Sequence, residues 1–153
     1  MPGSCSAGYY CPDQTTEISC PPGFYCPMNS LKPTPCPGGT FNPYELQESL
    51  QDCLPCPMGS YCVSGSSFMT PCEPGYFCSK DRLSFPDGHC LKGQYCPAGS
   101  VNATECGPGY FSGIDYSEEC TKCPGGSFSN DNSSVVCNKC PQGYYCPPGS
   151  TAQ

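Results

Sequence analysis

The stretch CPPGFYC at residues 20–26 shows the pattern on which the fold of this chain depends. Its cysteine is followed three residues later by glycine and five residues later by an aromatic residue. Counting that cysteine as position 1, the same spacing begins again at Cys5, Cys36, Cys56, Cys72, Cys90, Cys106, Cys123 and Cys140. Nine such repeats at a short period predict a tandem array in which each repeat contacts its neighbours.

Each repeat contains two cysteines, which accounts for all 18 in the chain. In six short repeats the second cysteine follows the aromatic residue directly, at Cys11, Cys26, Cys62, Cys78, Cys96 and Cys146. In three long repeats it comes later, at Cys53, Cys120 and Cys137. We expect residues 1–153 to form one continuous array, with repeats at 5–19, 20–35, 36–55, 56–71, 72–89, 90–105, 106–122, 123–139 and 140–153.

The composition predicts that disulfides replace a conventional core. Leu, Ile, Val and Phe number only 19 among 153 residues, too few for a packed apolar interior. A high cysteine content in a short chain is typical of disulfide scaffolds, which persist in oxidising compartments. The expected fold is a small disulfide-rich array of short turn or hairpin repeats that forms an elongated rod with little regular secondary structure. The expected location is extracellular, either secreted or on a cell or flagellar surface.

Each recurring residue type has an expected role. Glycine at position 4 allows a turn with positive φ. The proline that often precedes this glycine has its own φ fixed by its ring, at a value that suits the turn. The aromatic residue at position 6 offers a large surface for stacking on a neighbouring repeat. These rings are Tyr10, Tyr25, Phe41, Tyr61, Phe77, Tyr95, Phe111, Phe128 and Tyr145.

One short helical segment is predicted in the first long repeat. Asn42 would cap it, Pro43 would be its first residue and Glu45 would complete a capping box. Leu46 and Leu50 would lie on one face of this helix.

The cysteine spacing favours a disulfide within each repeat. The expected pairs are Cys36–Cys53, Cys106–Cys120 and Cys123–Cys137 in the long repeats, and Cys5–Cys11, Cys20–Cys26, Cys56–Cys62, Cys72–Cys78, Cys90–Cys96 and Cys140–Cys146 in the short ones. Pairing across repeat borders would instead create tight Cys-x2-Cys bridges, a spacing more usual in redox motifs. A crossed pattern within Cys5–Cys26 or Cys56–Cys96 is the alternative.

These residues carry a family resemblance. The long repeats resemble ephrin-receptor-like cysteine-rich repeats and the simplest modules of tumour-necrosis-factor-receptor ectodomains. The short Cys-Pro-x-Gly-x-Tyr-Cys repeats are similar to those of large protist and algal surface proteins, among them the mastigoneme glycoprotein of flagellar filaments. The resemblance spans Cys5 to Cys146 and implies an extracellular cysteine-rich repeat protein.

Zinc is the main alternative use of the cysteines. Cys120, Cys123, Cys137 and Cys140 follow the spacing of four-thiolate structural zinc sites. The same four cysteines also fit the repeat pattern, and the other fourteen fit that pattern without the zinc spacing. We therefore expect disulfides and no bound metal or cofactor.

The sequence gives little support for catalysis or for calcium binding. His89 is the only histidine, so a histidine-based triad or metal site is not expected, and Asp87-Gly88-His89 reads as a solvated loop. Glu118 and Glu119 read as a solvated carboxylate pair. Asp131 lies in an oxygen-rich stretch that lacks the alternating ligand spacing of a calcium loop. We expect that the protein is not an enzyme.

The charge of the chain argues against nucleic acids and acidic membranes as partners. The net charge is −7, and only six basic residues are scattered along the sequence. Binding to phosphates requires clustered basic residues. No stretch approaches the 18 apolar residues of a membrane span, so direct insertion is not expected.

Glycans and self-association are the expected surface features. Asn102 and Asn132 each begin an N-glycosylation sequon, and the many Ser and Thr are compatible with O-linked sugars. Five further aromatic residues precede a position-6 ring and would face the opposite side of an extended chain. These candidate interface residues are Tyr9, Phe24, Tyr76, Tyr110 and Tyr144.

The expected function is that of a structural subunit in an extracellular filament or surface coat, with itself and other surface glycoproteins as partners. The alternative is the ligand-binding ectodomain of a receptor or adhesin. Pro2-Gly3-Ser4 matches the end of a repeat, as in Pro148-Gly149-Ser150. We therefore expect the array to be a segment of a longer protein, with a true start at Met1 as the alternative.

Overall fold

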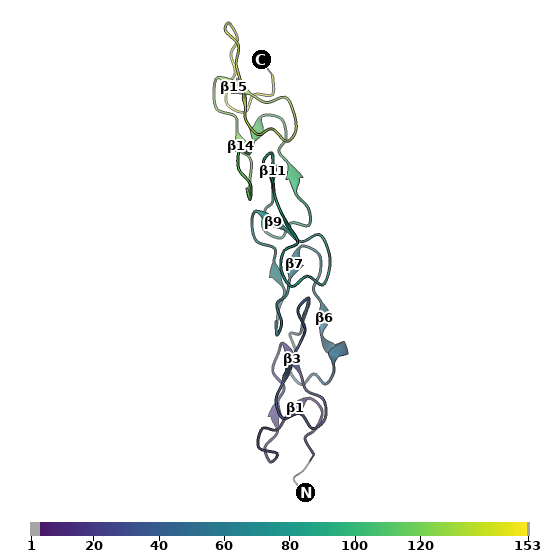
Figure 1. Ribbon diagram of the computed structural model, residues 1–153. Helices are drawn as coiled ribbons and strands as arrows, with labels where there is room; N and C mark the ends of the chain where they lie inside the picture. The colour runs from purple at the N-terminus through teal and green to yellow at the C-terminus, as the bar shows by residue number, and fades with distance from the viewer. Residues whose placement is uncertain (1–3, 153) are drawn as a thin grey trace. The chain divides into compact units, whose positions relative to one another are not determined.

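The computed structural model describes residues 4–152, in which regular structure is limited to two-residue strands and one short 3-10 helix (Figure 1). The strands pair in eight antiparallel hairpins. The pairs are β1 (Tyr9–Tyr10) with β2 (Ile18–Ser19), β3 (Phe24–Tyr25) with β4 (Thr34–Pro35), β5 (Thr40–Phe41) with β6 (Leu54–Pro55), β7 (Ser60–Tyr61) with β8 (Thr70–Pro71), β9 (Tyr76–Phe77) with β10 (Gly88–His89), β11 (Gln94–Tyr95) with β12 (Thr104–Glu105), β13 (Tyr110–Phe111) with β14 (Thr121–Lys122), and β15 (Ser127–Phe128) with β16 (Asn138–Lys139). The chain is therefore a small disulfide-rich protein of tandem hairpins, as predicted.

Each hairpin joins the aromatic residue of one repeat to the residues just before the next repeat. In the second repeat, Phe24 lies opposite Pro35 and Tyr25 opposite Thr34. The carbonyl of Gly23 then accepts a hydrogen bond of 2.9 Å from the N–H of Cys36. The hairpin thus ends where the following repeat begins, which explains why the strands are so short.

A four-residue turn with glycine in its third place occupies positions 2–5 of every repeat. The N–H of position 5 donates to the carbonyl of position 2 at 3.0–3.2 Å. The φ of the position-4 glycine lies between 83° and 90° in all nine repeats, a region that side chains with a Cβ rarely adopt. The predicted role of this glycine is confirmed.

A second turn with positive φ follows in each repeat, three or four residues after position 7. The residues that adopt this φ are Gln14, Asn29, Leu46, Gly65, Arg82, Gly99, Tyr116, Ser133 and Gly149. Because six of these residues have a Cβ, residue type alone does not identify the turn. The only sequence signal for this second turn is the dipeptide Gly-Ser or Asn-Ser, with which some of these four-residue turns end.

The chain divides into two compact parts. The first contains the described residues up to Thr70 together with Lys80–Phe85, and the second contains Pro71–Ser79 and the described residues from Pro86 onward. The first part includes repeats 1–3 and repeat 4 up to Thr70, and the second includes repeats 6–9.

Within each part, successive repeats are joined by three kinds of backbone hydrogen bond. The N–H of the position-4 glycine donates to the position-7 carbonyl of the next repeat, as from Gly8 to Cys26 at 2.8 Å. The N–H at position 7 donates into the second turn of the next repeat, as from Cys26 to Gln47 at 2.8 Å. The residue with positive φ donates back to the first cysteine of the preceding repeat, as from Leu46 to Cys20 at 3.0 Å.

The position-4 glycines also contact the repeat two places further on. A Cβ added to Gly75 would lie 2.5 Å from the carbonyl oxygen of Tyr116. Comparable clashes closer than 3.0 Å arise for Gly8 against Leu46, Gly23 against Gly65, Gly39 against Arg82, Gly93 against Ser133 and Gly109 against Gly149. Glycine is therefore required here for close backbone approach as well as for its positive φ.

Disulfides form the core. All eighteen cysteines are paired within their own repeats, so the predicted connectivity is confirmed in every pair and the crossed alternative is not observed. Among the described residues, the largest fully buried side chains are eleven cysteines and Asn42. The apolar interior is thus built from sulfur rather than from aliphatic side chains.

The predicted helix near Asn42 is wrong. The side chain of Asn42 accepts a hydrogen bond from the N–H of Tyr44 at 3.0 Å, which is the interaction expected of a helix cap. Leu46 has a φ of 64°, however, so the backbone cannot continue as a right-handed helix. The only helical element among the described residues is the 3-10 helix η1 (Leu50–Asp52), where the Asp52 carboxylate accepts a hydrogen bond from the N–H of Ser49.

Candidate functional site

The five predicted interface rings differ in exposure. Tyr110 is 40% exposed and Tyr144 is 61% exposed, whereas Tyr9, Phe24 and Tyr76 are half-buried. Tyr110 and Tyr144 are therefore the two of these rings most available to another molecule.

Phe24 and Tyr76 contact other repeats of the same chain. The Tyr76 and Tyr116 ring centroids are 5.2 Å apart, and a Cβ on Gly65 would lie 3.7 Å from the tip of the Phe24 ring. Both contacts reach two repeats further along the chain. These position-5 rings therefore help to connect repeats, a role that we had expected of the position-6 rings.

His89 does not lie in a solvated loop, so that prediction is wrong. It is half-buried in β10, opposite Tyr76, and its ring stacks on that of Tyr116 with centroids 4.2 Å apart. His89, Tyr76 and Tyr116 thus form a three-ring cluster that joins residues from two repeats.

The position-6 rings are half-buried in repeats 1–8, and no ring–ring contact between them is found in residues 4–152. The Phe77 ring instead lies over Gly88, its partner across the hairpin. In repeat 9 the corresponding ring, Tyr145, is 84% exposed. Among residues 4–152, no second strand pairs with the segment that contains Tyr145.

Two open depressions lie in the second compact part. One, of about 350 Å³, is lined by Tyr95, Pro108 and the exposed Tyr110 among other residues, so it places a second aromatic ring near Tyr110. The other, of about 450 Å³, is lined by Tyr116, Glu118 and Glu119 among other residues. Both glutamates are exposed, which agrees with the prediction of a solvated pair.

Both glycosylation sequons lie on the surface. Asn102 and Asn132 are exposed, so an attached glycan would extend into solvent. The hydroxyl of Ser134, the third residue of the second sequon, is 2.6 Å from that of Ser129 and donates to the carbonyl of Asp131. Asp131 therefore contributes its backbone carbonyl to a turn.

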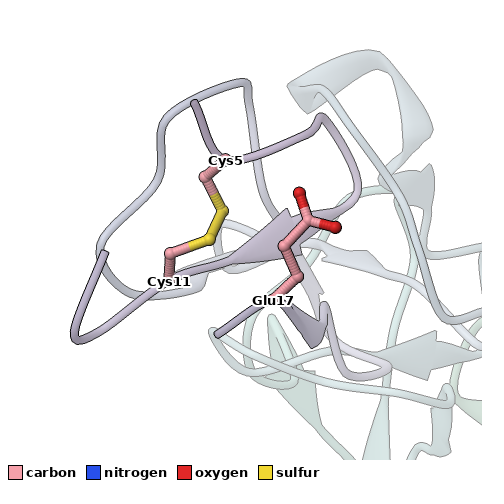
Figure 2. A group of neighbouring side chains, drawn as sticks. All are labelled: Cys5, Cys11 and Glu17. Carbon is pink, nitrogen blue, oxygen red and sulfur yellow. A yellow bond between two sulfur atoms is a disulfide. The ribbon is translucent and has the colours of Figure 1, made fainter. Parts of the chain in front are cut away.

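The four cysteines with zinc-like spacing belong to three different disulfides, Cys106–Cys120, Cys123–Cys137 and Cys140–Cys146. Cysteine binds zinc as a thiolate, and a disulfide sulfur does not supply one. The described residues also bring Glu17 beside the Cys5–Cys11 disulfide (Figure 2). The same chemical argument applies there, and the Glu17 carboxylate already accepts a hydrogen bond from the N–H of Ser6 at 2.8 Å.

Two carboxylates of the first repeat are held in their charged form by hydrogen bonds. The backbone N–H groups of Thr15 and Thr16 donate to Asp13, which lowers the pKa of Asp13 to about 2. Hydrogen bonds from Ser6 lower the pKa of Glu17. Both side chains therefore remain anionic at physiological pH.

Sequence reasoning missed the residues at position 7 of the long repeats, where the short repeats have cysteine. These residues are Asn42, Ser112 and Ser129, and all three are buried. Asn42 donates to the carbonyl of Phe24 at 2.9 Å, and the Ser112 hydroxyl is 2.6 Å from that of Ser117. The long repeats thus have a hydrogen-bonded polar side chain where the short repeats have a buried cysteine. The regular occurrence of Asn or Ser at position 7 of the long repeats is the sequence signal that could have identified these residues.

The fold and these surfaces define the class of protein as a cysteine-rich protein with nine disulfides in tandem short hairpins. So many disulfides indicate an oxidising, extracellular environment. No protein-family profile matches the sequence, and comparison with curated proteins finds no significant match. Among the described residues, no helix has the length and hydropathy needed to cross a bilayer.

Proposed function

We propose that this chain is a structural subunit of an extracellular, glycosylated filament or surface coat of the mastigoneme-like kind, and that it self-associates through exposed aromatic rings. The proposal assigns the protein a mechanical role rather than a catalytic one. Disulfides hold each repeat, backbone hydrogen bonds join the repeats, and exposed rings join one chain to another.

The observation that carries the proposal is the aromatic surface around Tyr110. This ring is 40% exposed and borders a depression that it shares with Tyr95 and Pro108. Aromatic residues are enriched at the centres of protein interfaces, where they bury a large area at a small entropic cost. Tyr110 is therefore the residue that we assign to contact with a second chain.

The surface composition also fits an assembled coat. Large apolar side chains are widely exposed, among them Phe68 at 69%, Phe85 at 68% and Ile114 at 68%. Exposed apolar surface of this kind favours association with other molecules. The exposed sequons at Asn102 and Asn132 would add a glycan layer to the faces that remain in contact with water.

Electron microscopy of the protein secreted from a glycosylating host tests the proposal. We expect fibres or sheets whose formation depends on protein concentration. Tyr110→Ser should remove most of the assembly while leaving all nine disulfides intact by mass. Tyr44→Ser is the matched control, because Tyr44 is 62% exposed but lies outside the position-5 set, and this variant should assemble normally.

A receptor or adhesin ectodomain is the second candidate, supported by the depression of about 450 Å³ beside Tyr116. Its aromatic wall and two carboxylates could contact a polar ligand. This function predicts that the secreted chain stays monomeric at high concentration and binds a ligand saturably. A monomeric chain that shows no assembly under any tested condition would contradict the filament proposal and favour this one.

A further inference from the structure

We infer that the hydroxyl of Tyr116 is a sulfation site, which accepts a sulfuryl group from a nucleotide phosphosulfate while the chain passes through the secretory pathway. This inference goes beyond the proposed function, because it requires secretion of the chain but not its assembly. Every cysteine is in a disulfide, which indicates that route. Tyr116 lies in repeat 7, with repeats 5 and 6 before it and repeats 8 and 9 after it.

Three acidic residues surround Tyr116 in the sequence. Asp115 precedes it directly, and Glu118 and Glu119 follow two and three positions later. No lysine or arginine lies within five positions of it. None of the other ten tyrosines has more than two acidic residues within four positions. Tyr116 therefore has the most acidic sequence environment of any tyrosine in the chain.

An acidic environment is what a sulfuryl-transferring enzyme selects. The donor, a nucleotide phosphosulfate, is a polyanion, so an enzyme that binds it must have a positively charged active site. Such a site attracts a tyrosine flanked by carboxylates and repels one flanked by lysine or arginine. Charge complementarity thus favours Tyr116 over the other tyrosines as the acceptor.

The structure leaves this acidic segment accessible. Asp115, Glu118 and Glu119 are exposed, and Tyr116 is 50% exposed. Among residues 4–152, the Tyr116 hydroxyl has no hydrogen-bond partner. Tyr116 and both glutamates also line the open depression of about 450 Å³, which offers room for a transferred group.

Contacts on the inner side of the loop hold Tyr116 in place. Its N–H donates to the carbonyl of Cys90 at 2.8 Å, and the hydroxyl of the next residue, Ser117, is 2.6 Å from that of Ser112. The Tyr116 ring stacks on His89 with centroids 4.2 Å apart. These contacts fix the backbone and the ring but do not use the hydroxyl. The transferase would therefore bind this tyrosine in a turn that is already formed.

The transfer requires no oxidant or reductant. The phenolic oxygen of Tyr116 forms a bond to the sulfur of the donor, and the bond from that sulfur to the bridging phosphate oxygen breaks. The electron pair of the broken bond leaves with the nucleotide, and a base of the transferase takes the phenolic proton. The product is a sulfate ester, which adds a negative charge near Glu118 and Glu119.

Mass spectrometry of the chain secreted from a tyrosine-sulfating host tests the site. After removal of N-glycans and reduction, trypsin releases residues 93–122, which contain Tyr95, Tyr110 and Tyr116. We expect one sulfuryl group on this peptide, located at Tyr116 by fragmentation and distinguished from a phosphoryl group by accurate mass. An unmodified peptide from a host that sulfates a co-expressed reference protein, or a phosphoryl group at Tyr116, would overturn the inference.

A pair of tyrosine variants checks the acceptor. Tyr116→Phe keeps the ring that stacks on His89 and should remove all sulfate from the peptide of residues 93–122. Tyr110→Phe is the matched control and should leave the sulfate in place, because Tyr110 is 40% exposed but has no acidic residue within four positions. Sulfate that persists in Tyr116→Phe would assign the site to another tyrosine and contradict the inference.

A pair of carboxamide variants checks the recognition. Replacing Glu118 and Glu119 together by Gln should lower the rate of sulfation roughly tenfold, because the loop loses attraction for a basic active site. Replacing Glu45 and Glu48 by Gln, beside the exposed Tyr44, removes the same charge elsewhere and should leave the rate unchanged. Equal rates for the two double variants would contradict the role of the acidic residues.

Purified transferase and the nucleotide phosphosulfate test whether the folded turn is the substrate. The native chain, made in a host without the transferase, should be modified at Tyr116 while all nine disulfides remain intact. Modification only after reduction and alkylation would show that the folded chain blocks the hydroxyl, and would overturn the inference. The disulfides of each variant are checked by mass, so that misfolding is not mistaken for lost recognition.

These results are separate from those that test the filament. Fibres formed by a chain without sulfate at Tyr116 would support the filament proposal and overturn this inference. A sulfated chain that stays monomeric at high concentration would contradict the filament proposal and support this inference.

Discussion

At the residue scale, glycine at position 4 meets two separate demands. It must adopt a positive φ, and in repeats 1–3 and 5–7 it must also let the backbone of a later repeat approach closely. Only the first demand follows from local geometry. The two demands can be separated because Gly143 shares the φ of Gly75 but has open space around it.

Gly75→Ala should therefore destabilise the protein more than Gly143→Ala. Both variants have similar backbone strain, but only at residue 75 does the new methyl group meet the Tyr116 carbonyl. We expect an additional cost of about 1–3 kcal/mol, typical of overpacking. Thermal unfolding with the disulfides intact measures it, and faster hydrogen exchange at the Tyr116 amide locates it. Equal melting temperatures for the two variants would contradict the proposed close contact.

Asn42 is the second residue-scale test. Its side chain is fully buried, donates to the Phe24 carbonyl and accepts from the Tyr44 amide. Asn42→Ala leaves these backbone groups without a partner and should cost about 1–3 kcal/mol. Asn42→Ser should cost less, because serine occupies the same position in the other two long repeats. Unfolding in denaturant compares the variants, and an alanine variant as stable as the serine variant would argue against the hydrogen-bonding role.

At the scale of the element, the unit of structure is a disulfide-closed turn followed by a two-residue hairpin. Strands of two residues cannot be stable alone, since even long isolated hairpins are marginal in water. Each hairpin is therefore held by its disulfide and by hydrogen bonds to its neighbours. The relative weight of these two contributions can be measured, because the short repeats close loops of equal length.

The comparison is between the Cys90–Cys96 disulfide inside the array and Cys140–Cys146 in repeat 9. Both span a sequence separation of 6, so the loop-closure entropy is the same, about 2.4 kcal/mol each. Cys90 and Cys96 are fully buried between other repeats, whereas Cys140 is partly exposed. Replacing the internal pair by alanine should therefore cost roughly 1–3 kcal/mol more than replacing the pair of repeat 9. Calorimetry of the two double variants tests this, and equal losses would mean that packing adds nothing to loop closure.

The elements also show where local rules fail. The segment after Asn42 has a favourable helix cap and a proline in the first helical position, and the predicted capping interaction is present at Tyr44. The helix does not form because Leu46 adopts a positive φ and donates its N–H to Cys20 of the preceding repeat. A contact between repeats thus overrides a local helix propensity.

At the scale of the whole molecule, disulfides replace the aliphatic core. With only 19 Leu, Ile, Val and Phe residues, burial of apolar surface cannot offset the conformational entropy of the chain. Complete reduction should therefore unfold all repeats together. Protease resistance and amide protection, compared with an untreated sample at the same pH and temperature, report this directly. Persistence of protected amides after reduction and alkylation would show that a core independent of the disulfides exists.

The sequence by itself determined the repeat number, the disulfide pairing of the long repeats and the glycine turns of this protein, whereas the structure decided against a crossed pairing in the short repeats. These features depend on residues fewer than twenty positions apart, and strict cysteine spacing leaves few alternatives for them. Tertiary structure alone decided which rings connect repeats, which polar groups replace buried sulfur, and which glycines allow close approach. The second turn shows the reason: Gln14, Leu46, Arg82, Tyr116 and Ser133 share one backbone conformation but no side-chain chemistry. From the second repeat onward, their N–H groups bond to the preceding repeat. Contacts between repeats impose that conformation, and the residue pattern of the sequence does not reveal those contacts.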